Sequence, residues 1–349
     1  MNSELTIKKE TQGEFFKILN GYINSEVLAA SCELGLFSVL SQAEAMSLED
    51  IAERLQLPLH SARVLLLACC AIHLIERDAD GLYRNTDIAR TFLVPESPTC
   101  MLAFVRFNDQ VQKKCCSRLT ESLREGRNVG LDEFPGEGSS LYERLASRPQ
   151  LEKTFQEGMF EFTRLAGTSL PFPEMAEIKT LLDLGGGVGS VATDLCEKNP
   201  NLEVTVADVA SVCEVGRKKI ADKAVANRIK FVATDFLSQE FPGPTDGILL
   251  SHVVEIFSPE EIKELYRKAF AALPIGGRLF VWTLTSSDDE TGPFQAAKSS
   301  VYFLCAASGR GMTYPGIDHQ RWLAEVGFKS VSRKDFAEIN HGSFVAIKS

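Results

Sequence analysis

One short run of glycines has the residue types and the spacing of a nucleotide-binding loop. It reads Asp183-Leu184-Gly185-Gly186-Gly187-Val188-Gly189, between an apolar strand pattern and a helical pattern. Glycines let the backbone approach a ligand where a Cβ would clash, and the amides that open the helix face that ligand. A dinucleotide fingerprint, G-x-G-x-x-G, would need a glycine at Ser190. The run instead fits D-x-G-x-G-x-G, through Asp183, Gly185, Gly187 and Gly189.

Three further features follow the glycine run along the chain. Asp208 ends the next predicted strand, where an acidic residue about 20 residues on can hold ribose hydroxyls. Asp235-Phe236 follows the third strand, and offers a carboxylate for an adenine amino group and a ring for the adenine face. The segment Leu-Pro-Ile-Gly-Gly-Arg-Leu at 273–279 leads into the fifth strand. The combination is far more specific than any one of its parts.

The elements that must position these residues alternate between strands and helices from Ile178 onward. Short apolar runs predict strands at 181–184, 204–207, 229–232, 247–250 and 279–282, and helical periodicity predicts helices at 191–198 and 260–273. Two last runs, 330–333 and 343–347, are spaced like a hairpin. This alternation is typical of an α/β fold with a mostly parallel, Rossmann-like sheet whose faces are covered by helices.

The first third of the chain predicts helices and one hairpin, an order that resembles a winged helix. Ser47 with Asp50 is an N-cap signature, an apolar helix is expected over 61–75, and Asp80-Gly81 is a hairpin signal. In the helix at the recognition position, Arg63 alone could contact phosphate, so packing and dimerisation are favoured over DNA reading. We expect three parts: a winged-helix dimerisation domain at 1–100, a helical linker or substrate cap at 101–173, and a cofactor-binding domain at 174–349.

These features in this order resemble the class I S-adenosylmethionine-dependent methyltransferases. With the winged helix, nearly the whole chain resembles the small-molecule O-methyltransferases of plants and bacteria, such as the caffeate, acetylserotonin and hydroxyneurosporene enzymes. The resemblance implies S-adenosylmethionine as the cofactor, a homodimer formed through the N-terminal domain, and cofactor contacts at Gly185, Asp208, Asp235 and Phe236. Ser251 stands where that family often has a Lys or Arg near the cofactor, and so departs from its pattern.

A second departure concerns the catalytic base. The family has a His in a segment resembling L-x-x-V-L-H-D-W-S-D-E, and here Glu255 takes that position. Transfer of a proton from a phenol, with a pKa of about 10, to an ordinary Glu, with a pKa of about 4.3, is uphill by about 8 kcal/mol. Glu255 therefore suits an acidic hydroxyl or an aminium, or a role in holding the substrate. We expect it to face the methyl-bearing sulfur across the substrate pocket.

The domain expected at 174–349 also contains three histidines. His252 could be a substitute base if the strand ends before it, with a structural role at the strand end equally open. His319 lies in a segment that the resemblance places at the pocket lip. His341 falls in the expected terminal hairpin turn, where solvent exposure is the simplest expectation.

Composition restricts the classes of partner. The net charge of −10 argues against a nucleic-acid binder, which needs a basic face to neutralise phosphates. The nine cysteines include no C-x-x-C pair, and no metal-ligand cluster is recognisable, so we expect reduced thiols and no metal. The N-terminal residues lack the pattern of a signal peptide, and no apolar run approaches the roughly 20 residues of a membrane span. A cytoplasmic protein without membrane association is therefore expected.

The leading interpretation is a methyltransferase acting on a hydrophobic small molecule of secondary or pigment metabolism, with O-methylation favoured and C- or N-methylation possible. The alternative is a family member that binds S-adenosylmethionine but catalyses decarboxylation, hydroxylation or cyclisation. A third hypothesis, a transcription regulator with a degenerate cofactor domain, is weakened by the intact glycine run and the non-basic winged helix.

Overall fold

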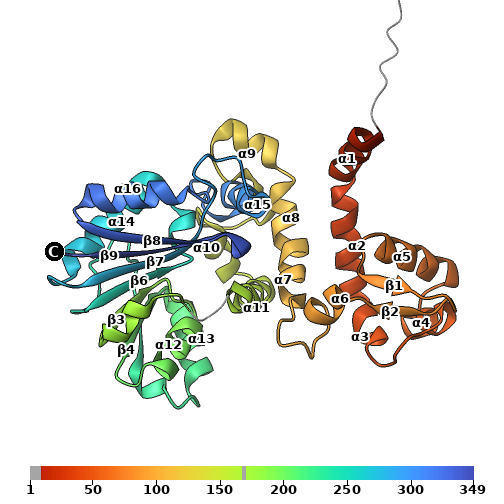
Figure 1. Ribbon diagram of the computed structural model, residues 1–349, viewed down its shortest axis with the longest axis horizontal. Coiled ribbons are helices and arrows are strands. Elements are labelled where there is room, and N and C mark those ends of the chain that lie inside the picture. The colour runs from red at the N-terminus through yellow and green to blue at the C-terminus, as the bar shows by residue number, and fades with distance from the viewer. Residues whose placement is uncertain (1–8, 167–169) are drawn as a thin grey trace, which may run out of the picture. The chain divides into compact units, whose positions relative to one another are not determined.

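The computed structural model describes residues 9–166 and 170–349. These residues form two compact units, one containing residues up to 111 together with 153–165, and the other containing 112–152 together with the described residues from 166 on (Figure 1). The boundaries expected at residues 100 and 173 remain predictions.

The first unit consists of short helices around one hairpin. Its elements are α1 (Lys9–Leu19), α2 (Gly21–Glu33), α3 (Leu36–Leu40), α4 (Leu48–Arg54), α5 (Leu59–Ala71), β1 (Ile75–Arg77), β2 (Tyr83–Asn85), α6 (Asp87–Phe92), α7 (Leu102–Phe107), the start of the π-helix η1 (Asn108–Gln112) and most of α11 (Pro149–Ala166). The predicted N-cap is confirmed, since Ser47 Oγ accepts the Asp50 N–H at 3.1 Å. The predicted hairpin is also confirmed, with β1 and β2 antiparallel.

The second unit is built on a seven-stranded sheet. Its strands are β3 (Thr180–Leu184), β4 (Glu203–Asp208), β5 (Ile229–Ala233), β6 (Gly247–Ser251), β7 (Arg278–Leu284), β8 (Ser330–Phe336) and β9 (His341–Ile347), in the order β5-β4-β3-β6-β7-β9-β8. The first five are parallel, and β9 pairs antiparallel with both β7 and β8. The expected mostly parallel sheet and terminal hairpin are confirmed, and β9 lies between β7 and β8.

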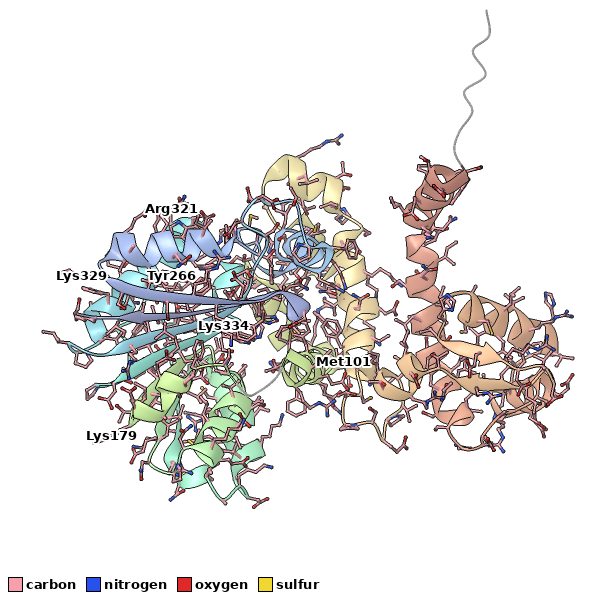
Figure 2. All side chains as sticks on the ribbon, viewed as in Figure 1. Met101, Lys179, Tyr266, Arg321, Lys329 and Lys334 are labelled. Atoms are coloured by element: carbon pink, nitrogen blue, oxygen red, sulfur yellow. The ribbon has the colours of Figure 1, made fainter. Side chains whose placement is uncertain are left out.

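Helices cover both faces of this sheet, and alternate residues of each strand point to opposite cores. Leu182, Leu184, Leu279 and Val281 pack in one core, and Leu181, Phe280 and Trp282 pack in the other. The first core takes side chains from α14 (Pro259–Ala272) and α16 (Gly316–Val326), and the second from α12 (Ser190–Lys198) and α13 (Ala210–Ile220). Figure 2 shows Tyr266 of α14, which is fully buried in the first core.

The rest of the second unit is a set of short helices beside the sheet. They are α8 (Lys113–Cys116), α9 (Leu119–Glu125), η2 (Val129–Glu133), α10 (Leu141–Ala146), η3 (Pro173–Glu177), η4 (Ala226–Arg228), η5 (Val254–Ile256), α15 (Phe294–Tyr302), the π-helix η6 (Phe303–Ala307) and η7 (Ala337–Ile339). In the described part of the chain, no helix is both long and apolar enough to cross a bilayer.

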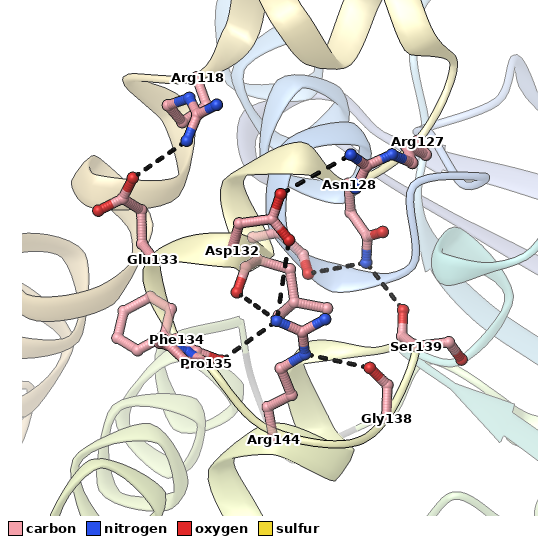
Figure 3. Close-up of polar contacts among 12 residues, drawn as sticks. Arg118, Arg127, Asn128, Asp132, Glu133, Phe134, Pro135, Gly138, Ser139 and Arg144 are labelled. Carbon is pink, nitrogen blue, oxygen red and sulfur yellow. Dashed lines mark hydrogen bonds and ion pairs between the residues drawn. The ribbon is translucent and has the colours of Figure 1, made fainter.

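A polar network fixes the chain between η2 and α10 (Figure 3). Arg144 donates to the carbonyl oxygens of Leu131 at 2.8 Å and Gly138 at 3.0 Å. Asn128, which is buried, donates its amide to Ser139 O at 2.9 Å and lies 3.5 Å from the carbonyl oxygens of two η6 residues. Because buried carbonyl groups need donors, these contacts hold α10 and η6 in place beside one another.

Candidate active site

The glycine loop is formed where β3 ends at the carboxyl edge of the sheet. Gly185 has φ 68° and Gly187 has φ 60°, backbone conformations that favour glycine. A Cβ at Gly185 would lie 2.7 Å from Val253 Cγ2 and 3.8 Å from the ring of Phe236. A Cβ at Gly187 would meet nothing within 4 Å. The loop therefore packs closely on its protein neighbours at Gly185 and is open at Gly187, where a ligand can approach the backbone.

Two carboxylates stand at this loop. Asp208, at the end of β4, accepts the N–H of Gly187 at 2.9 Å and that of Val209 at 2.7 Å. Asp183 is fully buried, and neither of its oxygens has a hydrogen-bond partner among the described residues. Burial, with the charge of Asp208, raises the pKa of Asp183 to about 7. An unpartnered buried carboxyl beside an open glycine backbone fits a site for a bound polar ligand.

Asp235, Phe236 and Ser251 complete the same edge. Asp235 is exposed and follows β5, and its hydrogen bond from Ser238 Oγ at 2.6 Å holds the pKa of that carboxyl below its usual range. The half-buried ring of Phe236 lies beside Gly185, as the loop geometry shows. Ser251 is the last residue of β6 and is half-buried. The strand order places the ends of β5, β4, β3 and β6 next to one another, so the structure brings the predicted cofactor residues to one edge.

His252 and Glu255 meet where β6 ends. His252 has φ 54°, an uncommon conformation for a residue other than glycine, and donates its N–H to Trp282 O at 2.8 Å. The chain then leaves the sheet. The N–H of Leu284, two residues after Trp282 on β7, therefore has no β6 carbonyl oxygen to accept it. Oε1 of Glu255 accepts that N–H at 3.1 Å, and lies 3.3 Å from Nδ1 of His252.

Glu255 is buried with only 2% of its surface exposed. Burial alone would raise the pKa of its carboxyl, but the hydrogen bond and charge of His252, with the N–H of Leu284, outweigh it and hold the pKa below its usual range. Glu255 is thus an ionised carboxylate bound to the N–H of Leu284 and to Nδ1 of the His252 imidazole.

The expectation that His341 is solvated is wrong. The hairpin turn is η7, which ends before His341, and His341 begins β9 between two neighbouring strands. It is 2% exposed, and its ring stacks on Trp282 at 4.7 Å and meets His252 edge-to-face at 4.9 Å. Burial lowers its pKa to about 4. This burial was not predicted from the sequence because the strand begins two residues earlier than the expected 343–347, and those two residues decide whether His341 lies in the turn or in the core.

His319 does not join this group. It lies on α16, 1% exposed, and its Nδ1 is hydrogen bonded to Tyr266 at 2.8 Å. Its ring packs on Trp322 and Phe344, each at 5.2 Å between centroids. Burial lowers its pKa to about 4, so it is a neutral core histidine at pH 7.

One tyrosine lies near Glu255, and no sequence motif predicts it. Tyr142 of α10 lies close enough to Glu255 for the carboxylate charge to affect its hydroxyl, and it lies beside Tyr302, the last residue of α15. Burial and that charge raise the pKa of Tyr142. The helix continues from Tyr302 as the π-helix η6, a feature that recurs at functional sites. No spacing in the sequence distinguishes Tyr142 and Tyr302 from the other aromatic residues.

Comparison with known proteins identifies the family. A family model described as an O-methyltransferase domain matches residues 116–329, and a second, described as an O-methyltransferase dimerisation domain, matches residues 16–95. The chain belongs to the O-methyltransferase family. It is an S-adenosylmethionine-dependent methyltransferase, with the fold and cofactor that the sequence predicted.

Several members of this O-methyltransferase family resemble the chain over nearly its whole length. The L-tyrosine C(3)-methyltransferase of Streptomyces lavendulae is 32% identical, covering 95% of this chain and 91% of that protein. The 3-hydroxy-5-methyl-1-naphthoate 3-O-methyltransferase of Streptomyces sahachiroi is 30% identical, covering 94% and 93%. Among solved structures, apo SibL, an S-adenosylmethionine-dependent methyltransferase, has 34% identity and a TM-score of 0.81, covering 96% of this chain and 98% of SibL. Human N-acetylserotonin methyltransferase bound to S-adenosylmethionine shares the fold, with a TM-score of 0.87 at 23% identity and full coverage of both chains.

Proposed function

We propose that this methyltransferase acts on a hydroxylated aromatic small molecule of secondary metabolism, with His252 as the general base and Glu255 as the residue that orients it. The observation that carries the proposal is the contact of 3.3 Å between Nδ1 of His252 and Oε1 of Glu255. The next residue after His252, Val253, packs against the glycine loop at Gly185, so this pair lies close to the proposed cofactor site. A carboxylate on one imidazole nitrogen leaves the other to accept a proton, the arrangement found in many base–orienter pairs.

The cofactor residues are assigned from the geometry of the glycine loop and the carboxyl edge of the sheet. S-adenosylmethionine supplies a methyl group on a sulfonium, already activated for transfer. The open backbone at Gly187, with Gly185 and Gly189, would receive it, and Asp183 and Asp208 would accept its donors. The ring of Phe236 and the carboxylate of Asp235 would border the adenine, with Ser251 at the same edge. The chain itself then has to position the acceptor and take its proton.

An imidazole suits the proton transfer better than a carboxylate. Ordinary pKa values are about 10 for a phenol, 6.5 for an imidazole and 4.3 for a glutamate, so the transfer is uphill by about 5 kcal/mol to the first base and 8 kcal/mol to the second. Glu255 has its Oε1 already engaged by Leu284 and His252. We therefore assign the base to His252, and no longer to Glu255 as its place in the chain suggested.

The relatives support a phenolic acceptor without fixing the acceptor atom. One of them is named for a ring carbon of L-tyrosine and another for the oxygen of a hydroxynaphthoate. Removal of a phenol proton makes the oxygen and the ring carbons beside it more nucleophilic, so one base serves both outcomes.

We also propose a homodimer formed through the first unit. Apolar side chains remain exposed on α1 and α5, among them Phe15 at 58%, Ile18 at 81% and Leu67 at 71%. Large exposed apolar side chains grouped on few elements mark an interaction surface. This surface falls in or beside the part of the chain that matches the family's dimerisation domain.

The test of the catalytic pair is His252→Ala in the full chain, assayed by release of S-adenosylhomocysteine from S-adenosylmethionine with L-tyrosine and a panel of hydroxynaphthoates. Turnover should fall by about 100-fold or more, the usual range for a general base, while calorimetry shows unchanged affinity for S-adenosylmethionine. His60→Ala, at an exposed histidine, is the control. Full activity of His252→Ala together with an inactive Glu255→Gln would return the base to Glu255.

A further inference from the structure

Two hydrogen-bond acceptors near the end of β7 are buried and have no partner among the described residues. They are Oε2 of Glu255 and Nε2 of His341, on side chains that are each 2% exposed. A buried polar atom left without a partner costs about 1–3 kcal/mol, and more when it is charged. Two such atoms in one place therefore indicate a ligand that is bound there during function.

The two side chains are neighbours because of the way β7 is bordered. Leu284 donates its N–H to Glu255 on the side where β6 has ended. On its other side Leu284 is paired with His341 of β9. His252 bridges the same two groups, at 3.3 Å from Glu255 and with its ring centroid 4.9 Å from that of His341.

Both unpartnered atoms can only accept a hydrogen bond. Glu255 is ionised, because its contacts hold its pKa below the usual range. His341 is neutral, because burial lowers its pKa to about 4. Its Nδ1 faces the carbonyl oxygen of Ile339, which can only accept, so the ring proton is on Nδ1 and Nε2 carries a lone pair.

We propose that the acceptor substrate carries a primary ammonium group, which Oε2 of Glu255 and Nε2 of His341 bind, and a separate hydroxyl, which His252 deprotonates. An ammonium has three N–H donors and a positive charge, whereas a hydroxyl has one donor and no charge. It would satisfy both buried acceptors and neutralise the buried carboxylate, which a neutral phenol cannot do. The proposal rests on the proposed function, and it narrows the substrate class to aromatic molecules with a hydroxyl and an amine.

The test uses phenols that differ only in the amine. The full chain, saturated with S-adenosylhomocysteine, is titrated calorimetrically with tyramine and 4-ethylphenol, and with L-tyrosine and 3-(4-hydroxyphenyl)propanoate. In each pair the amine should bind about 10-fold to 100-fold more tightly, the range expected for a charged hydrogen bond. Binding is measured without turnover, so the result does not depend on which group is the base.

Three variants then test whether Glu255 and His341 cause the preference for the amine. Glu255→Gln keeps an oxygen for the N–H of Leu284 but removes the charge, and should reduce the preference to about 2-fold or less. His341→Phe keeps a ring on Trp282 but removes Nε2, and should reduce it by a smaller factor. Glu260→Gln makes the same chemical change at an exposed glutamate and should leave the preference intact.

The ammonium site would be overturned if neither amine bound more tightly than the partner that lacks the amine. It would also be overturned if the preference for the amine survived in Glu255→Gln. Methyl transfer to the neutral phenols that depends on His252 would leave the proposed function standing in that case. Conversely, an amine preference lost in Glu255→Gln, with turnover that does not need His252, would support the ammonium site and refute the base.

Discussion

At the scale of single residues, Asp208 connects the glycine loop to the end of β4. Its two oxygens accept backbone N–H groups of Gly187 and Val209, and burial raises its pKa, although those two hydrogen bonds lower it in part. The carboxylate is therefore already fixed in position, and ribose hydroxyls could add to its remaining lone pairs. A carboxylate of this kind contributes to ligand affinity by being oriented before the ligand arrives.

We predict that Asp208→Ala weakens binding of S-adenosylmethionine by about 2 kcal/mol or more, as when a charged hydrogen-bond partner is lost. Calorimetry on the full chain would measure this change. Glu203→Gln, at the exposed opposite end of β4, is the matched control and should bind normally. Unchanged affinity of Asp208→Ala would remove Asp208 from the cofactor site.

At the scale of elements, the packing of α14 and α16 on the sheet encloses a histidine. His319 of α16 is hydrogen bonded to Tyr266 of α14, and burial lowers its pKa to about 4. In the unfolded chain a histidine takes up a proton below a pH of about 6.5. Between these two values His319 binds a proton more readily in the unfolded state than in the folded state, so its contribution makes acidification favour unfolding.

We therefore predict that the free energy of unfolding falls as the pH is lowered from about 6.5 toward 4. His319 accounts for up to about 3 kcal/mol of this loss, since each unit of pKa corresponds to about 1.4 kcal/mol. His319→Asn should reduce the dependence, as measured by urea denaturation at pH 7, 6 and 5, and buried His341, whose pKa is also lowered to about 4, should account for part of the slope that remains. His60→Asn, at an exposed site, should leave it unchanged. An identical slope in His319→Asn and the parent protein would contradict the assignment.

At the scale of the whole molecule, the exposed apolar side chains of the first unit bear on assembly. The residues Ala62, Leu66 and Cys69 of α5 are buried in that unit, while Val64 and Leu67 of the same helix face outward. An apolar helix that is covered on one side only has surface left for a second chain. A twofold dimer would cover the same surface on both copies.

The proposed dimer can be tested by introducing charged side chains on its apolar surface. Ile18→Asp together with Leu67→Asp should shift the protein from dimer to monomer, because burying two unpaired carboxylates in each half of an interface is costly. Sedimentation velocity at micromolar concentration would report the change. Ile275→Asp, at an apolar residue that is 84% exposed in the second unit, is the control and should remain dimeric. A double variant that sediments as a dimer would place the interface elsewhere.

The sequence by itself determined the fold and the identity of the cofactor, and it predicted the edge of the sheet at which the cofactor binds. Periodicity located the strands and the covering helices, because a buried strand has to be apolar along its length. The spacing of Gly185, Gly187, Gly189, Asp208 and Asp235 predicted that these residues lie at one edge of the sheet, and the strand order confirms this placement because the ends of neighbouring parallel strands meet there. These features depend on short stretches of chain, which the sequence displays directly.

Only the tertiary structure decided the surroundings of Glu255. His341 is far from Glu255 along the chain, and β9 brings it there by entering the sheet between β7 and β8. Glu255 is ionised although it is buried, because His252 and the N–H of Leu284 both contact its carboxylate where β6 ends. Tyr142 reaches the same place from another element of the second unit. Such contacts depend on strand order and on where a strand ends, which no local pattern of residues encodes.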